Sequence, residues 1–138
     1  MGYAIIVVLG FIYLSYVSKI SEWVIISALG FKSSTPQYFL THENIYHYIG
    51  WLIAALIIIS SFFIADLITG FITVIVAWLL GNNSGKTSAF SSYRRTMKEM
   101  VEIAESKEER KTYEDEMNKT DTELKQKVKD YKNLFKYE

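Results

Sequence analysis

An acidic side chain inside an apolar segment is the residue in this sequence with the clearest chemical consequence. Asp66 is the only formally charged residue between Ile45 and Leu80. A carboxylate at the depth of a bilayer costs about 2.5–3.5 kcal/mol on insertion scales, and its pKa rises on burial unless a partner stabilises the charge. Three roles follow for Asp66: an ion pair with Lys19, a group facing a polar lumen or another subunit, or a proton or ion site.

Two further charges, Lys19 and Glu22, interrupt the first apolar segment. An antiparallel pair of helices that turns near residue 38 sets Lys19 opposite residue 57, and a longer overhang moves it toward Asp66. We therefore expect Lys19, Glu22 and Asp66 to make polar contacts within the membrane or between subunits.

No other residues form a convincing catalytic or metal-binding set. His42 and His47 are five residues apart, so they do not share a helix face, whereas Glu43 and His47 do. The chain has no cysteine, which excludes thiolate chemistry. Its net charge is zero, while a nucleic-acid binder needs an excess of Lys and Arg. The sequence predicts no enzyme, no cofactor, no metal and no nucleic-acid partner.

The distribution of charged residues along the chain predicts the helices and loops that position these residues. Residues 1–31 predict a first transmembrane helix, 32–44 an external loop, and 45–81 a second, long transmembrane helix. That second stretch is about 54 Å long if it is helical throughout, far more than a ~30 Å hydrocarbon core. A single tilted helix is favoured over two spans with a break near Ser60 or Asp66, because 57–67 contains no glycine, proline or polar cluster.

Glycine, asparagine and serine after Leu80 predict a helix stop and a linker over 82–91, followed by a charged helical tail over 92–138. Lys86, Arg94, Arg95 and Lys98 follow the apolar segment closely, and such basic residues favour the cytosolic side. With two spans, both termini are then cytosolic and the chain is a multi-pass protein of the cytoplasmic (inner or plasma) membrane.

The tail is predicted to contain two helices. Thr120 and Glu123 have the spacing of a capping box, which predicts a helix start. An apolar stripe at helical spacing predicts a surface that docks onto a partner or onto the tail's own first helix. It is too short for a confident coiled coil. The residues proposed for this partner-binding surface are Met97, Val101, Leu124, Val128, Tyr131 and Phe135.

The run 65–72, with Asp66, Thr69 and Gly70 as its firm positions, precedes a polar stretch and the basic cluster 93–98. This pattern resembles phage holins of the toxin-secretion/phage-lysis type. The resemblance covers about a quarter of the chain, and the expected further spans after the basic cluster are missing. It implies a small protein that oligomerises in the cytoplasmic membrane and opens it, with Asp66 and Thr69 lining a wet lesion and Gly70 allowing close helix contact.

Together these observations predict an all-α integral membrane protein, a long transmembrane helical hairpin with an amphipathic cytosolic tail. Two functions are open. One is a holin-like, non-enzymatic protein that oligomerises with further copies in lipid. The other is an accessory or scaffold subunit of a larger membrane complex that docks a cytosolic partner through its tail.

Overall fold

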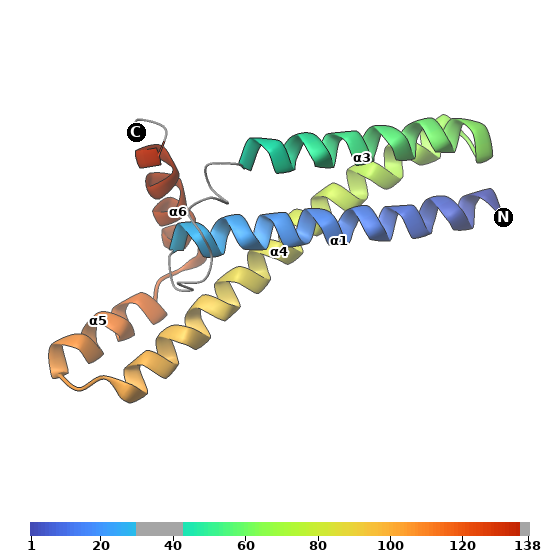
Figure 1. Ribbon diagram of the computed structural model, residues 1–138. Coiled ribbons are helices and arrows are strands. Elements are labelled where there is room, and N and C mark those ends of the chain that lie inside the picture. The colour runs from blue at the N-terminus through green and yellow to red at the C-terminus, as the bar shows by residue number, and fades with distance from the viewer. Residues whose placement is uncertain (30–42, 136–138) are drawn as a thin grey trace. The chain divides into compact units, whose positions relative to one another are not determined.

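A computed structural model describes residues 1–29 and 43–135, and all statements below concern those residues. They form five α-helices and no strand (Figure 1). This confirms the all-α prediction. The helices are α1 (Gly2–Leu29), α3 (Glu43–Ile64), α4 (Leu67–Ile103), α5 (Lys107–Met117) and α6 (Asp121–Phe135).

The chain divides into two compact units. We call the described residues of 1–22 and 42–86 the apolar unit, and the described residues of 23–41 and 87–138 the charged unit. The helices α1 and α4 each contribute to both units.

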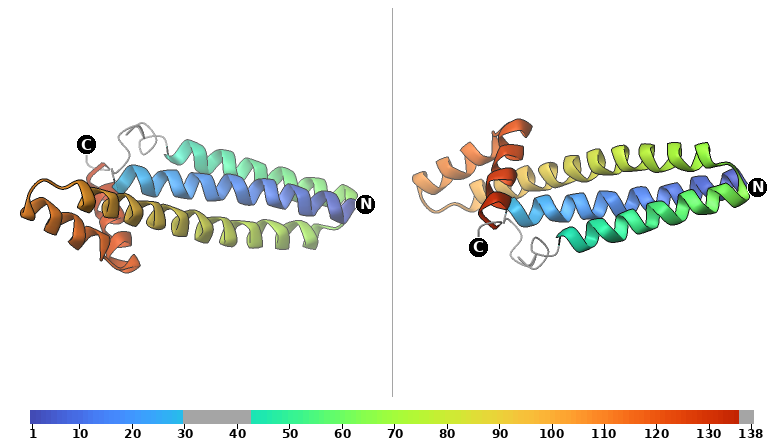
Figure 2. Two further views of the ribbon diagram at one scale, coloured as in Figure 1. Left: turned by 90° about the horizontal axis from the view of Figure 1, so that it is seen from below. Right: turned by 90° about the horizontal axis from the view of Figure 1, so that it is seen from above.

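In the apolar unit, α1 lies beside α3 and runs antiparallel to it (Figure 2). At one end, Gly2 lies against the carbonyl group of Ile64. Toward the other end, the hydroxyl of Tyr16 donates a hydrogen bond of 2.8 Å to the carbonyl oxygen of Tyr46. We call the end at Gly2 and Ile64 the turn end, and the opposite end, where α1 carries Lys19 and Glu22, the polar end.

The helix α4 is parallel to α1, because contacts advance along both chains in the same direction. Gly10 of α1 lies against Thr73, and farther along both helices Ser18 lies against Gly85. The three helices therefore alternate in direction, and each passes from one end of the apolar unit to the other.

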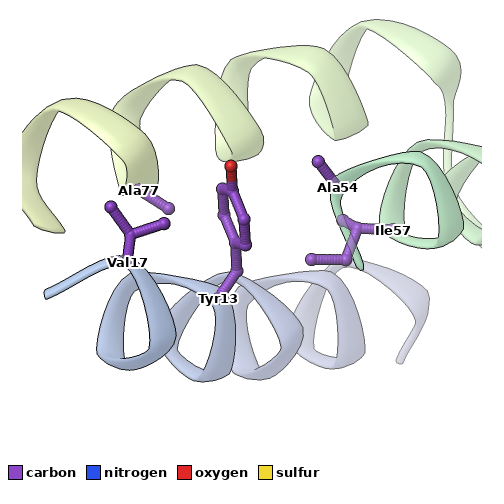
Figure 3. Packing of buried hydrophobic residues seen from close by; sticks show 5 residues of the cluster. All are labelled: Tyr13, Val17, Ala54, Ile57 and Ala77. Atoms are coloured by element: carbon purple, nitrogen blue, oxygen red, sulfur yellow. The ribbon is translucent and has the colours of Figure 1, made fainter. Parts of the chain in front are cut away.

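The interior of this unit is a small apolar cluster with one aromatic ring at its centre. Figure 3 shows the ring of Tyr13 rising from α1 toward α4. It is packed with Val17 of the same helix, Ala54 and Ile57 of α3, and Ala77 of α4. Small residues on α3 and α4 leave space for the ring, which holds the three helices together.

The outward faces of the three helices remain apolar. Large exposed side chains include Phe11 on α1, Trp51, Leu56 and Phe63 on α3, and Ile68, Ile72 and Ile75 on α4. A water-soluble protein buries such faces. All three helices are long and apolar enough to cross a membrane, which supports the predicted membrane class.

The favoured prediction of a single long helix over 45–81 is wrong, because the chain turns at Ala65 and Asp66 between α3 and α4. The break lies near Asp66, as in the predicted alternative. The apolar part of the chain therefore has three helices, α1, α3 and α4, where the predicted hairpin has two. The segment 57–67 contains no glycine, proline or polar cluster. The helix after the turn is instead capped by one side chain, because the carboxylate of Asp66 accepts the backbone N–H of Thr69.

The predicted linker over 82–91 is also helical, since α4 continues through it to Ile103. Its glycines are used for contact with α1, as described below, rather than for a turn. The predicted loop 32–44 lies mostly outside the described residues, and α3 begins at Glu43 within it.

The charged unit contains one more helix than the tail was expected to have. Ser106 caps α5, because its side chain accepts a hydrogen bond from the backbone N–H of Glu109. The predicted capping box is confirmed at α6. The backbone N–H of Thr120 donates to Glu123 at 3.1 Å, and that of Glu123 donates to the Thr120 hydroxyl at 3.3 Å.

Candidate functional site

Asp66 is the N-terminal cap of α4. One carboxylate oxygen accepts the backbone N–H of Thr69 and the other accepts the Thr69 hydroxyl, both at 2.7 Å. These two bonds, together with the influence of the Tyr3 hydroxyl, lower the pKa of Asp66 below its usual value. The increase expected for an isolated carboxylate is therefore not found, because Asp66 is hydrogen-bonded at a turn rather than stranded in the middle of a helix.

Gly70, the third residue of the predicted motif, brings α3 and α4 together directly after this turn. A Cβ atom at Gly70 would lie 1.9 Å from the Ser61 hydroxyl oxygen and 3.3 Å from the Ile58 Cα. Ser61 is fully buried, and its hydroxyl donates to the Ile58 carbonyl at 2.7 Å. The expected close helix contact at Gly70 thus occurs within one chain.

The predicted ion pair between Lys19 and Asp66 is not formed. Lys19 pairs with Glu22 on its own helix at 3.4 Å, and its side chain is 71% exposed. Asp66 lies at the turn end, where α1 begins, so Lys19 is roughly 25 Å away along α1. The prediction assumed a two-helix hairpin, and the additional turn at Asp66 changes which residues lie opposite α1.

A seam of small and polar residues joins α1 to α4 near the polar end. Gly81 and Gly85 are four residues apart on α4, the spacing that lets helix backbones approach closely in membranes. A Cβ at Gly85 would lie 2.3 Å from the Ser18 carbonyl oxygen, and one at Gly81 would lie 2.9 Å from that of Leu14. The predicted linker places these glycines in a loop, whereas their four-residue spacing is itself a signal for helix packing.

Polar side chains complete this seam. The Ser18 hydroxyl donates to the Ser84 hydroxyl, and the Ser21 hydroxyl donates to the Asn82 carbonyl oxygen, both at 3.4 Å.

The uncharged lengths of the three helices in the apolar unit are roughly 25–33 Å, which matches the bilayer core. Lys19, Glu22 and Lys86 therefore fall where such a core would end.

The charged unit contains a cluster of buried and half-buried polar groups centred on Glu116, at the end of α5. Its carboxylate accepts hydrogen bonds from Tyr93 of α4, from Lys119, and from Lys127 of α6 at 2.9 Å. The Lys127 ammonium also lies 5.4 Å from the centre of the Tyr93 ring. We call Tyr93, Glu116 and Lys127 the latch.

The electrostatics of the latch follow from these contacts. Partial burial raises the pKa of Glu116, but hydrogen bonds from Lys119, Tyr93 and Lys127 outweigh it and lower the pKa from 4.5 to about 2. A second link lies beside it, where Arg94 donates to the Lys119 carbonyl oxygen at 3.1 Å and pairs with Asp121. The carboxylate of Glu116 therefore links α5 to α4 and α6.

Part of the predicted partner-binding stripe is used within the chain. Leu124 is fully buried and Val128 is nearly so, whereas Met97, Val101 and Tyr131 are half-buried. The side chain of Phe135 lies outside the described residues. Leu124 and Val128 are therefore covered by other parts of the chain, while the proposed binding of a partner to the stripe stays a prediction.

The remaining candidate, the histidine cluster, is a local pair. His47 and Glu43 are 3.2 Å apart on one face of α3, while His42 lies outside the described residues. Among the described residues, no group of three or more His, Cys, Asp or Glu could hold a metal ion.

No protein-family description, curated protein or solved structure matches this chain.

Proposed function

We propose that the chain is a non-enzymatic, three-span membrane subunit that anchors a helical cytosolic unit and serves as a scaffold within a larger membrane complex. The main support for this proposal is that the polar residues and glycines of the apolar unit make their contacts within the chain. Asp66 and Thr69 cap α4 after the turn, and the glycines of α4 pack against α1 or α3. The surface that remains is apolar, as expected of helices in contact with lipid or with other apolar helices.

The orientation that best fits three spans differs from the one predicted for two. The turn end carries no Lys or Arg, whereas Lys19 and Lys86 lie toward the polar end and Arg94, Arg95 and Lys98 follow. The positive-inside tendency then favours a cytosolic polar end and an external N-terminus. Under this proposal the charged unit stays cytosolic, and the segment 32–44 is cytosolic rather than external.

A holin-like function is the second candidate, favoured by the Asp66, Thr69 and Gly70 pattern. It would require those residues to leave their present contacts and face water or other copies. Each of them is engaged within the chain, so lesion formation would need rearrangement of the α3–α4 turn. For this reason we place the scaffold function first.

Expression of the chain alone in cells with an intact membrane potential separates the two functions. A scaffold subunit leaves membrane permeability to a small dye unchanged, and it is degraded when its partners are missing. Abrupt permeabilisation that is abolished by Asp66→Asn or Gly70→Leu would support the holin function instead. Asp115→Asn, an exposed carboxylate change in α5, serves as the control variant.

A further inference from the structure

Tyr13 carries a hydroxyl group into the interior of the apolar unit. Only 4% of the residue is exposed, and Figure 3 shows the hydroxyl between Ala54 of α3 and Ala77 of α4. No hydrogen bond joins it to another residue in the part of the chain that the structure describes. Ser27, in the charged unit, alone has a fully enclosed polar side-chain atom without a partner among the described residues. The Tyr13 hydroxyl is therefore not enclosed and opens to the outside of the apolar unit.

The place where this hydroxyl opens lies on the side of the unit that α3 and α4 form. These helices meet at the turn end and diverge toward the polar end (Figure 2), and Tyr13 rises from α1 between them (Figure 3). The side chains beside the hydroxyl are the small ones of Ala54 and Ala77. Small residues let another helix approach closely in a membrane, so a further helix has access to the hydroxyl.

The depth of the hydroxyl determines what can bind it. The proposed insertion places the edge of the bilayer core near Lys19. Along α1, Tyr13 is roughly 9 Å from Lys19 and roughly 18 Å from Met1, well inside a ~30 Å core. Neither water nor a lipid headgroup supplies a partner at that depth. Because a buried phenol usually has a hydrogen-bond partner, we expect the partner to be a polar group of another protein segment.

Ser15 offers such a group on the opposite side of α1. It is exposed and lies two residues, roughly 3 Å along the axis and about 200° around it, from Tyr13. The exposed neighbours of Ser15 on this face are apolar and include Val8, Phe11 and Ile12. Because the copies of a chain insert in one orientation, Ser15 of one copy and Tyr13 of another lie at nearly the same depth.

We propose that a second copy of this chain binds to the α3–α4 side of the first through the outward face of its α1, with its Ser15 hydroxyl hydrogen-bonded to Tyr13. Each copy then offers Ser15 to one neighbour and Tyr13 to another. Such a heterologous contact repeats from copy to copy and gives a ring or a row. The inference rests on the three-span insertion proposed above, and it makes copies of this chain its neighbours within the complex.

Cross-linking tests the contact directly, because the chain has no native cysteine. Ser15→Cys and Ala54→Cys, on chains with different affinity tags, are reconstituted together in liposomes and treated with a short bis-methanethiosulfonate reagent. We expect a product that joins the two variants, and products larger than a dimer from a chain that carries both changes. Ala4→Cys is the matched control, since it lies exposed on the same face as Ser15 but roughly 16 Å away along α1. The contact is ruled out if Ser15→Cys and Ala54→Cys do not react together, or if Ala4→Cys reacts with Ala54→Cys equally well.

The hydrogen bond is tested by energy transfer between fluorophores on Lys129→Cys, an exposed position of α6, as the liposomes are diluted with lipid. Tyr13→Phe keeps the ring, so the core of the unit is preserved. Tyr13→Phe and Ser15→Ala should each weaken association by about three- to twenty-fold, the range given by hydrogen bonds between membrane helices, and the double variant should be no weaker than either single one. Tyr48→Phe makes the same change at a 73% exposed tyrosine and should associate like the wild type. Association of Tyr13→Phe equal to that of the wild type, or a wild-type chain that stays monomeric, contradicts the proposal.

The dye assay measures permeability, whereas these experiments measure association. A chain that permeabilises the membrane and still associates through Ser15 and Tyr13 overturns the scaffold function alone. A chain that leaves the membrane intact and stays monomeric overturns the contact between copies alone.

Discussion

At the scale of single residues, Glu116 shows how one carboxylate can hold three helices. Its negative charge is compensated by Lys119 and Lys127, and the Tyr93 hydroxyl donates to it. Its side chain is only 21% exposed, so solvent screens these interactions less than it would on an open surface. Removal of the charge would leave partly buried donors without their acceptor, which is the costly outcome.

We predict that acid weakens the charged unit through this residue. The pKa of Glu116 is lowered from 4.5 to about 2 in the folded chain, so its stabilising contribution is complete above about pH 4.5 and lost as the pH falls toward 2. Glu116→Gln should cost on the order of 1–3 kcal/mol at neutral pH and should reduce the loss of stability between these pH values.

Thermal unfolding followed by circular dichroism from pH 2 to 6 measures this effect, with Asp115→Asn as the control. An acid dependence that is equally steep in Glu116→Gln and in the wild type would contradict the assignment to Glu116.

At the scale of elements, helix content could be predicted from sequence but helix ends near packing contacts could not. The Thr120–Glu123 capping box is a local motif, and it was predicted correctly. The sequence predicts a break near Asp66 only as the less favoured alternative, because a single side chain, hydrogen-bonded to Thr69, caps the helix after it. The spacing of Gly81 and Gly85 signals helix packing, but it does not reveal that Gly85 lies against Ser18, sixty-seven positions earlier.

The seam between α1 and α4 gives a prediction at this scale. Gly85→Ala removes a poor helix former, which by itself would stabilise a helix by about 0.8–1.0 kcal/mol. The added Cβ would lie 2.3 Å from the Ser18 carbonyl oxygen and 3.0 Å from the Glu22 backbone nitrogen. Backbone atoms cannot move aside cheaply, and overpacking costs about 1–3 kcal/mol, so we expect net destabilisation.

Gly50→Ala is the matched control for this change. Its Cβ would meet only the ring of Tyr16, at 3.3 Å, and a side chain can shift by a few tenths of an ångström. Unfolding of both variants in detergent micelles by added sodium dodecyl sulfate would compare them. Equal stability of Gly85→Ala and Gly50→Ala would contradict close packing of α1 on α4.

At the scale of the whole molecule, the number of spans determines on which side each segment lies. Membrane class follows from composition alone, because apolar and charged residues are segregated along the chain. Topology does not, because it depends on one turn. In the proposed three-span topology, the segment 32–44 is cytosolic and the N-terminus is external.

The absence of native cysteine makes the proposed topology directly measurable. We predict that Ala65→Cys reacts with a membrane-impermeant maleimide in intact cells, because the proposed topology makes the α3–α4 turn external. Ser34→Cys and Ser88→Cys should react only after the membrane is permeabilised, because the same proposal makes the segment 32–44 and the region after Lys86 cytosolic. Labelling of Ser34→Cys in intact cells, with both Ala65→Cys and Ser88→Cys protected, would instead support two spans and an external 32–44 loop. The experiment therefore decides whether the carboxylate of Asp66 caps a helix at the outer surface or lies within a single long helix in lipid.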